Sequence, residues 1–134
     1  MTDLLLREDI GPVARLTLNS PSSLNALSDA MLAALSDAFA RLAQDRTIRV
    51  VILRGAGKAF CAGHDLKEMQ AARAAPDKGA AYFADLFTRC GAMMQAIPAL
   101  PQPVIAEVHG IATAAGCQLV ASCDLAVAAA GTRF

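Results

Sequence analysis

Two segments near the N-terminus, residues 4–10 and 13–18, place apolar residues among polar ones in a pattern typical of strands. Gly11 and Pro12 lie between the two segments, and this pair favours a hairpin-type turn. Three later apolar runs predict further strands, and the first two are continuous enough for burial on both faces. They are RVVILRG at 49–55, VIAEV at 104–108 and DLAVAAA at 124–130.

Apolar residues at helical spacing predict three helices. Ser28 suits the N-cap of the first helix, and Asp29 suits its positive end. The buried stripe of this helix is expected to contain Met31, Leu32, Leu35, Phe39 and Leu42. A loop rich in glycine and alanine follows the strand at 49–55. Residues 79–97 then predict a helix that is softly broken at Gly91 and stopped by IPALPQP, and residues 114–122 predict a short apolar helix.

The predicted order is strand, strand, helix, strand, helix, strand, helix, strand, which indicates an α/β protein with crossover connections. No linker-like composition divides the chain, so residues 1–134 are expected to form one core. Because the chain stops just after a strand, we expect either an open sheet edge or a continuation beyond Phe134.

Composition and charge exclude several classes of protein. The chain is 55% hydrophobic and 18% charged, and its 12 basic residues balance 12 acidic ones. A neutral chain does not suit nucleic-acid binding, which needs a basic face for phosphates. The N-terminus shows no secretory signal pattern. Residues 90–132 carry only two formal charges, but prolines, glycines and Gln118 interrupt them, so no membrane span is expected.

The cysteines and histidines do not form a metal-site pattern. Cys61, Cys90, Cys117 and Cys123 make no CxxC pair, and only two histidines are present, so no metal is expected. We expect reduced, buried, unreactive thiols in a cytoplasmic protein. Cys61 is the one thiol that lies beside a candidate site.

Two stretches, FCAGHDLKEM at 60–69 and GIATAAGCQLVASCD at 110–124, place glycine and alanine where the chain leaves a strand. A helical pattern follows each of these corners. Free N–H groups at such corners, facing one point, would stabilise a developing oxyanion, although tight packing alone also explains small residues. GAGK at 55–58 is not a phosphate loop, because Ile52 takes the place of its first glycine and Ala59 follows the lysine.

The ordered motifs SLNAL, RVVILRGAGKAF, AFCAGHDLKEM and PVIAEVHGIATAAGCQLVASCDLAVA resemble the enoyl-CoA hydratase/isomerase family of the crotonase superfamily. The likeness covers the whole chain and corresponds to the N-terminal half of the family core. It implies an α/β spiral of repeated strand-strand-helix units that is incomplete at the C-terminus. It also implies homo-trimers or hexamers, and acyl-CoA thioesters as ligands.

In this family two backbone N–H groups polarise the thioester carbonyl, and the resemblance places them at His64 and Ala115. It implies that the loop Ala62, Gly63, Asp65 and Leu66 holds the adenine end of CoA, that Lys67 meets CoA phosphates, and that Gly116 borders the thioester. CoA enters as part of the substrate, so no separate cofactor is implied. The family often has glycine at 114 and 115 and a basic residue at 22, whereas this chain has alanines and Ser22.

Gln118 is the main departure from the family pattern, because hydratases have a catalytic glutamate at this position. An amide does not usefully transfer protons at neutral pH, although it still hydrogen-bonds. The second hydratase glutamate would lie beyond Phe134. The imidazole of His64 is an alternative functional group, and Glu107, if buried, is an alternative acid. His109, Asp65 and Asp124 are expected to have structural roles.

The resemblance implies an enzyme, an enoyl-CoA hydratase-like lyase whose default reaction is hydration of 2-enoyl-CoA in fatty-acid metabolism. Two alternatives stay open because of Gln118. One is another reaction of the family, namely thioester hydrolysis, decarboxylation or isomerisation. The other is a CoA-ester-binding protein with little or no turnover.

Overall fold

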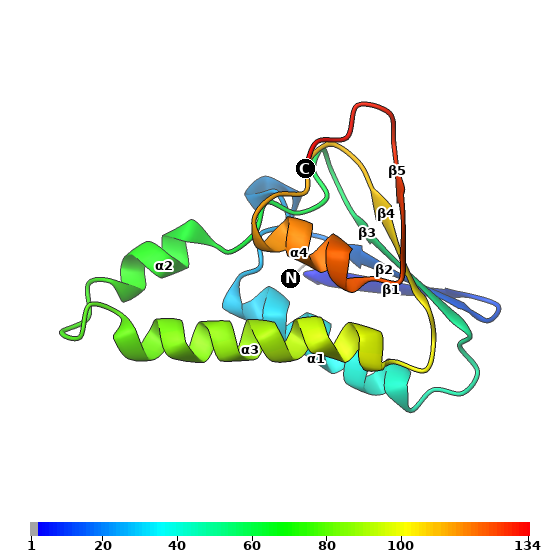
Figure 1. The fold of residues 1–134 in the computed structure, drawn as a ribbon, viewed down its shortest axis with the longest axis horizontal. Coiled ribbons are helices and arrows are strands. Elements are labelled where there is room, and N and C mark those ends of the chain that lie inside the picture. Colours follow the sequence, from blue (N-terminus) through cyan, green and yellow to red (C-terminus); the bar gives the residue numbers. More distant parts are fainter. Residues whose placement is uncertain (1–2) are drawn as a thin grey trace.

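The computed structural model describes residues 3–134. Its centre is a five-stranded sheet whose spatial order follows the chain order, β1-β2-β3-β4-β5 (Figure 1). β1 runs antiparallel to β2, and the later neighbours are parallel. The strands are β1 Leu5–Ile10, β2 Val13–Leu18, β3 Val50–Gly55, β4 Val104–Val108 and β5 Leu125–Ala128.

The helices gather on one side of the sheet, with α3 lying along α1 and α4 between α3 and the sheet, whereas α2 projects outward (Figure 1). The helical elements are η1 Pro21–Ser23, α1 Asp29–Ala43, α2 Leu66–Ala72, α3 Ala80–Ala99 and α4 Ala115–Ser122. No helix within residues 3–134 is long and apolar enough to cross a membrane. The mixed sheet and its helices confirm the α/β class expected from the sequence.

The core lies between the sheet and these helices. β2 and β3 bury alternate residues, so that Val51 and Leu53 are fully buried while Ile52 between them is only half-buried. The expectation that β3 and β4 are buried on both faces is therefore wrong. Within the described residues the helices cover one face of the sheet, and the other face stays partly accessible.

The first helix follows its prediction closely. The Ser28 side chain accepts a hydrogen bond from the Met31 N–H at 3.1 Å, which caps α1. All five residues of the predicted stripe are buried, namely Met31, Leu32, Leu35, Phe39 and Leu42. Sequence capping and periodicity together were therefore sufficient to define α1.

The second predicted helix is longer than expected, and a further helix precedes it. α3 runs through Gly91 without a break and ends at Ala99, with Pro98 inside its last turn. α2 lies where a helical pattern was expected after the corner at 60–69, although the predicted order of elements had only a loop between the strand at 49–55 and the helix at 79–97. The Asp65 carboxylate caps α2 by accepting hydrogen bonds from the N–H groups of Lys67 and Glu68 at 2.9 and 3.2 Å.

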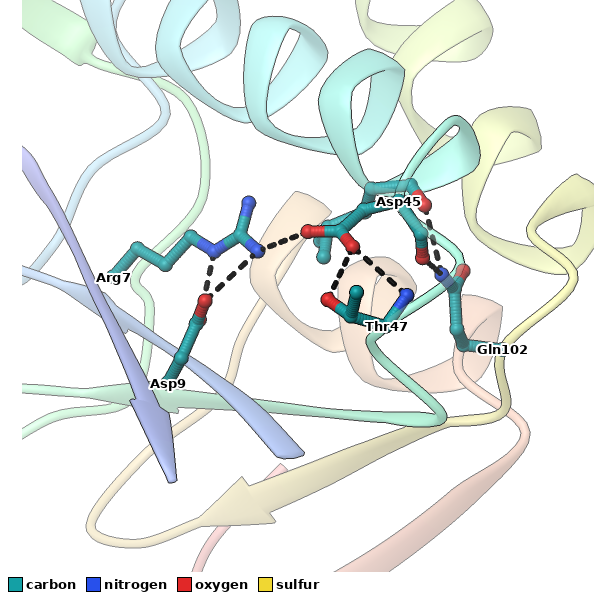
Figure 2. A network of polar contacts seen from close by, with 6 residues as sticks. Arg7, Asp9, Asp45, Thr47 and Gln102 are labelled. Carbon is teal, nitrogen blue, oxygen red and sulfur yellow. Dashed lines mark hydrogen bonds and ion pairs between the residues drawn. The ribbon is translucent and has the colours of Figure 1, made fainter. Parts of the chain in front are cut away.

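A polar network fixes the end of α1 that lies away from the two glycine corners (Figure 2). Arg7 on β1 pairs with Asp9 and with Asp45 in the loop after α1, both at 2.9 Å. The Gln102 amide, before β4, donates to the carbonyl oxygens of Leu42 and Asp45 at 2.7 and 3.1 Å. These contacts fix the end of α1 relative to β1 and to the start of β4. They thereby help to position the elements that carry the two corners.

Candidate functional site

The structure brings the two glycine and alanine corners into contact. Cys61 and Ala112 form a parallel bridge, and the Thr113 N–H donates to the Cys61 carbonyl at 3.1 Å. Gly116, in the first turn of α4, lies so close to the Cys61 carbonyl that a Cβ at this position would overlap it. Glycine is therefore required at 116 for the α4 corner to reach the other corner.

Two backbone N–H groups at this junction have no partner. Neither the N–H of His64 nor that of Ala115 donates a hydrogen bond within residues 3–134. Gly63 has a φ of +96°, and a Cβ built on it would lie 3.3 Å from the Ala115 nitrogen. The residue that precedes one free donor therefore contacts the other. Unpaired N–H groups at facing corners are the arrangement that stabilises a developing oxyanion.

A cavity of about 710 Å³ opens beside this junction. Five of the predicted site residues line it, and the rest of the wall comes from the loop before α1, from Met69 of α2 and from Ala114. Its lining is Ser22, Ser23, Ala26, Ala62, His64, Asp65, Leu66, Lys67, Met69 and Ala114. Gly63, Ala115 and Gly116 belong to the junction itself and do not line the cavity wall.

Ala114 lies between the cavity and the second donor, the Ala115 N–H, and its backbone has an unusual conformation. Its φ of +52° and ψ of −127° lie in a region that glycine adopts far more readily than residues with a Cβ. The residue immediately precedes Ala115, so its backbone sets the direction of the Ala115 N–H. The alanine at 114 thus keeps the backbone path of a glycine at the expense of local strain.

The His64 side chain is part of the cavity wall and is held by an aromatic neighbour. Its ring meets the Phe87 ring edge-on, with 5.8 Å between centroids and 66° between planes. Nδ1 is buried and has no hydrogen-bond partner within residues 3–134. Burial lowers the pKa of His64, while the backbone of Leu27 opposes this shift. The neutral imidazole is accordingly the favoured form near pH 7.

The predicted CoA-loop residues form the side of the cavity where α2 begins. The Asp65 carboxylate is engaged in capping α2. Leu66 is 76% exposed although it is apolar. Lys67 takes part in no ion pair within the described residues, which leaves its ammonium group available to an anion.

Gln118 is not brought into this cavity. It is exposed on α4 and lines a separate hollow of about 420 Å³, together with Gly91 and Gln95 of α3 and Asp124. The backbone carbonyl of Gln118 accepts a hydrogen bond from the Ser122 hydroxyl at 2.8 Å. In the described chain the Gln118 side chain and the two free N–H groups therefore border different spaces.

Three further polar residues have structural contacts. Glu107 is exposed and pairs with Arg54 at 2.9 Å, so the burial that an acid role would require is absent. His109 Nε2, in the turn that follows β4, lies 2.6 Å from the carbonyl oxygen of Gly57, in the loop that follows β3. The Asp124 carboxylate accepts a hydrogen bond from the Val104 N–H at 2.7 Å at the start of β4. The structural roles expected for His109 and Asp124 agree with these contacts.

Cys61 and Cys90 are buried, whereas Cys117 and Cys123 are only partly buried, and three of these thiols are held in their protonated form. Burial raises the pKa of Cys61 to about 11 and that of Cys123 to about 12, and it also raises the pKa of Cys90. Since the thiolate is the reactive form, these three thiols are unreactive near neutral pH. Within residues 3–134 no group of three or more histidine, cysteine or acidic side chains could hold a metal ion.

Asn25, in SLNAL, holds the loops around the site, a role that the sequence analysis missed. It is fully buried with a φ of +55°. Its amide donates to the carbonyls of Ala56 and Ala59, both at 2.9 Å, and its oxygen accepts from the Ser20 N–H. An asparagine between apolar residues in a loop is a usable signal for such a role.

Phe87 was placed on a helix by the sequence but not in the site. No sequence signal links it to His64, because the contact joins two segments 23 positions apart through tertiary packing. Met69 and Ala26, also in the cavity wall, were missed for the same reason.

The fold and the site geometry define an α/β protein of the crotonase type, and comparison with known proteins gives its family. A profile of enoyl-CoA hydratase/isomerase matches residues 8–134, so the chain belongs to the enoyl-CoA hydratase/isomerase family. This confirms the resemblance expected from the sequence. The family as a whole acts on acyl-CoA thioesters.

Individual relatives carry several names. Enoyl-CoA hydratase domain-containing protein 3, mitochondrial, from Xenopus laevis is 44% identical over 97% of this chain and 42% of the relative. 1,2-Epoxyphenylacetyl-CoA isomerase from Escherichia coli is 34% identical over 100% of this chain and 50% of the relative. A solved Mycobacterium smegmatis enoyl-CoA hydratase superposes with a TM-score of 0.92 at 60% identity, covering 99% of this chain and 50% of that one. The chain spans about half the length of the proteins that it matches.

The relatives also correct the expected location. The curated relatives from Xenopus laevis and Homo sapiens are named mitochondrial, which contradicts the expectation of a cytoplasmic protein. The expectation of a cytoplasmic protein rested on unpaired cysteines. Free thiols distinguish reducing from oxidising compartments, but they do not distinguish one reducing compartment from another.

Proposed function

We propose that this chain binds acyl-CoA thioesters, with the thioester carbonyl oxygen accepting hydrogen bonds from the backbone N–H groups of His64 and Ala115. The observation that carries the proposal is that these two N–H groups are unpaired, lie at corners in contact with each other and adjoin a cavity. Donors fixed in advance around a developing oxyanion are worth several kcal/mol to acyl chemistry. Enolate formation and attack at the carbonyl both develop such a charge.

The cavity wall suits the rest of the ligand. Lys67 supplies a cation for CoA phosphates, and Ala62, Asp65 and Leu66 form a shelf for the adenine end, with Gly63 beside them at the junction. Gly116 packs against the Cys61 carbonyl and so fixes the position of the neighbouring donor, the Ala115 N–H.

As an enzyme, the chain would belong among hydratase-like or isomerase-like catalysts, with hydration of 2-enoyl-CoA as the family default. Assembly into trimers or hexamers, and one core over residues 1–134, remain predictions.

Isothermal titration calorimetry with acetoacetyl-CoA tests the thioester site. Saturable binding that is at least tenfold tighter than binding of free CoA would support it, since each tenfold step corresponds to about 1.4 kcal/mol. Ala115→Val crowds the second donor and should weaken acetoacetyl-CoA binding. Ala121→Val, on the exposed side of the same helix, is the matched control. A folded chain that binds neither ligand would refute the proposal.

A second candidate function is binding of CoA esters with little or no hydratase turnover. Gln118 favours it, because an amide is a poor proton-transfer group and this side chain lies outside the cavity. Gln118→Glu tests this candidate with crotonyl-CoA as the substrate. A large gain in hydration would mean that the natural chain lacks only the base, whereas no change would place the reacting group elsewhere.

A further inference from the structure

The cavity contains few groups able to accept a proton. The titratable side chains in its wall are His64, Asp65 and Lys67. The Asp65 carboxylate already accepts two N–H groups at the start of α2, and an ammonium such as that of Lys67 has no acceptor lone pair. Gln118 lies in the other hollow. The imidazole of His64 is the proton acceptor that remains.

We propose that the His64 imidazole is a catalytic base that removes a proton from the α-carbon of a bound acyl-CoA thioester. The proposal rests on the proposed thioester site, and it adds a side-chain role to a residue that so far contributes only its backbone N–H. It also defines the substrate class as acyl thioesters with a hydrogen on the carbon next to the carbonyl.

Two features of the ring support this role. The N–H that holds the carbonyl oxygen and the imidazole belong to one residue, so the base is anchored beside the atoms on which charge develops. Phe87 fixes the ring edge-on, and Nδ1 is enclosed by protein, which leaves Nε2 as the nitrogen for a ligand. Burial favours the neutral form, and only a neutral imidazole accepts a proton.

The step is a proton transfer without a change of oxidation state. The bond between the α-carbon and hydrogen breaks, the proton moves to Nε2, and the electron pair delocalises into an enolate. The enolate oxygen is stabilised by the N–H groups of His64 and Ala115. The resulting imidazolium exchanges its proton with solvent and returns a solvent proton to the carbon. The net result in D₂O is deuterium in the acyl chain.

The test compares three proteins for deuterium uptake by butyryl-CoA in D₂O, followed by mass spectrometry. These are the natural chain, His64→Gln and the control His109→Gln, which changes the histidine outside the cavity. His64→Gln keeps the backbone N–H but cannot act as a base. We expect its exchange rate to fall by about 100-fold or more, the usual range for loss of a catalytic acid or base, with acetoacetyl-CoA binding retained. His109→Gln should exchange like the natural chain.

Each result has a distinct meaning. Equal exchange by His64→Gln and the natural chain would overturn the base assignment and leave the thioester site intact. A natural chain that binds acetoacetyl-CoA but exchanges nothing would overturn it as well. If the natural chain does not bind acetoacetyl-CoA, the thioester site is refuted, and this inference with it. If His64→Gln does not fold, imidazole NMR signals of the natural chain decide: butyryl-CoA must shift those of His64 and spare those of His109.

Discussion

Gly116 packs its α-carbon directly against the backbone carbonyl of Cys61, with no room for a methyl group between them. This contact holds the N-terminus of α4 against the other corner. The two free N–H groups depend on it, because a wider separation would move Ala115 away from Gly63. A position of this kind joins stability to function, because its substitution displaces a donor although the residue lies outside the cavity wall.

The first prediction concerns this contact. Gly116→Ala should lower the free energy of unfolding by about 3 kcal/mol, because the added methyl meets backbone that cannot give way. Chemical denaturation measures the change. Gly91→Ala on α3 is the control, since nothing lies within 4 Å of its added Cβ. Alanine is the better helix former, so this variant should gain about 1 kcal/mol. A Gly116→Ala protein as stable as the natural chain would contradict the packing described.

A second prediction uses the strain at Ala114. Ala114→Gly should raise the free energy of unfolding by about 1 kcal/mol, because relief of the positive φ outweighs the entropy cost of glycine. Ala121 is exposed on α4, the helix that Ala114 precedes. Ala121→Gly should lower the free energy of unfolding by about 1 kcal/mol. Thermal melts of both variants show whether each substitution raises or lowers stability. A loss of stability at both positions would show that position 114 is unstrained.

A third prediction concerns acid stability. The Arg89 guanidinium, 2.8 Å from Asp29, holds the pKa of that carboxyl below its usual value. A lowered pKa in the folded state gives stability that is present above about pH 4 and is lost as the pH falls through the folded pKa. Asp29→Asn should therefore lower the melting temperature at pH 7 but hardly at pH 3. Both partners are partly exposed, so the effect should stay below about 1 kcal/mol.

The control for this prediction is Asp37→Asn, which removes an exposed pair with Arg41 on the surface of α1. It should change stability by less than about 0.5 kcal/mol at either pH. If Asp29→Asn lowers the melting temperature equally at pH 7 and pH 3, the result would contradict the ion-pair explanation.

A fourth prediction concerns the thiols. With pKa values of about 11 and 12, Cys61 and Cys123 carry thiolate in roughly one molecule per thousand or fewer at pH 8. Iodoacetamide at pH 8 should label them far more slowly in the folded chain than in denaturant. Peptide mass spectrometry reads each site separately. Equal rates in both states would show that Cys61 is not held within the core and that Cys123 is not packed against it.

The sequence was sufficient where the signal is local. The hairpin turn, the capped and striped α1 and the short α4 each depend on neighbouring residues, and the structure confirms them. The signal for α2 was present too, since Asp65 followed by Glu68 at the third position is a capping pattern. The helical pattern after this corner was recognised, but the surrounding glycines and alanines kept it out of the predicted order of elements.

The remaining differences arise from tertiary contacts. Gly91 does not break α3, because residues on both sides of it, including Leu86 and Met93, are buried and hold the helix together. Whether Gln118 borders the cavity depends on how α4 packs against α3, and the contact of Phe87 with His64 depends on the position of α3. Neither arrangement can be inferred from residue spacing, so the sequence identified the backbone donors and the loop at 62–67 as candidates but not these side-chain positions.

The order of the strands in the sheet also bears on how the chain is made. Each strand pairs with the one that precedes it in the chain, from β1 to β5. The first pair is a hairpin that closes locally, whereas each later pair needs a crossover and is slower to form. A chain leaving the ribosome therefore presents every new strand to a partner that has already been synthesised. Across these five strands, the sheet can grow in one direction during translation.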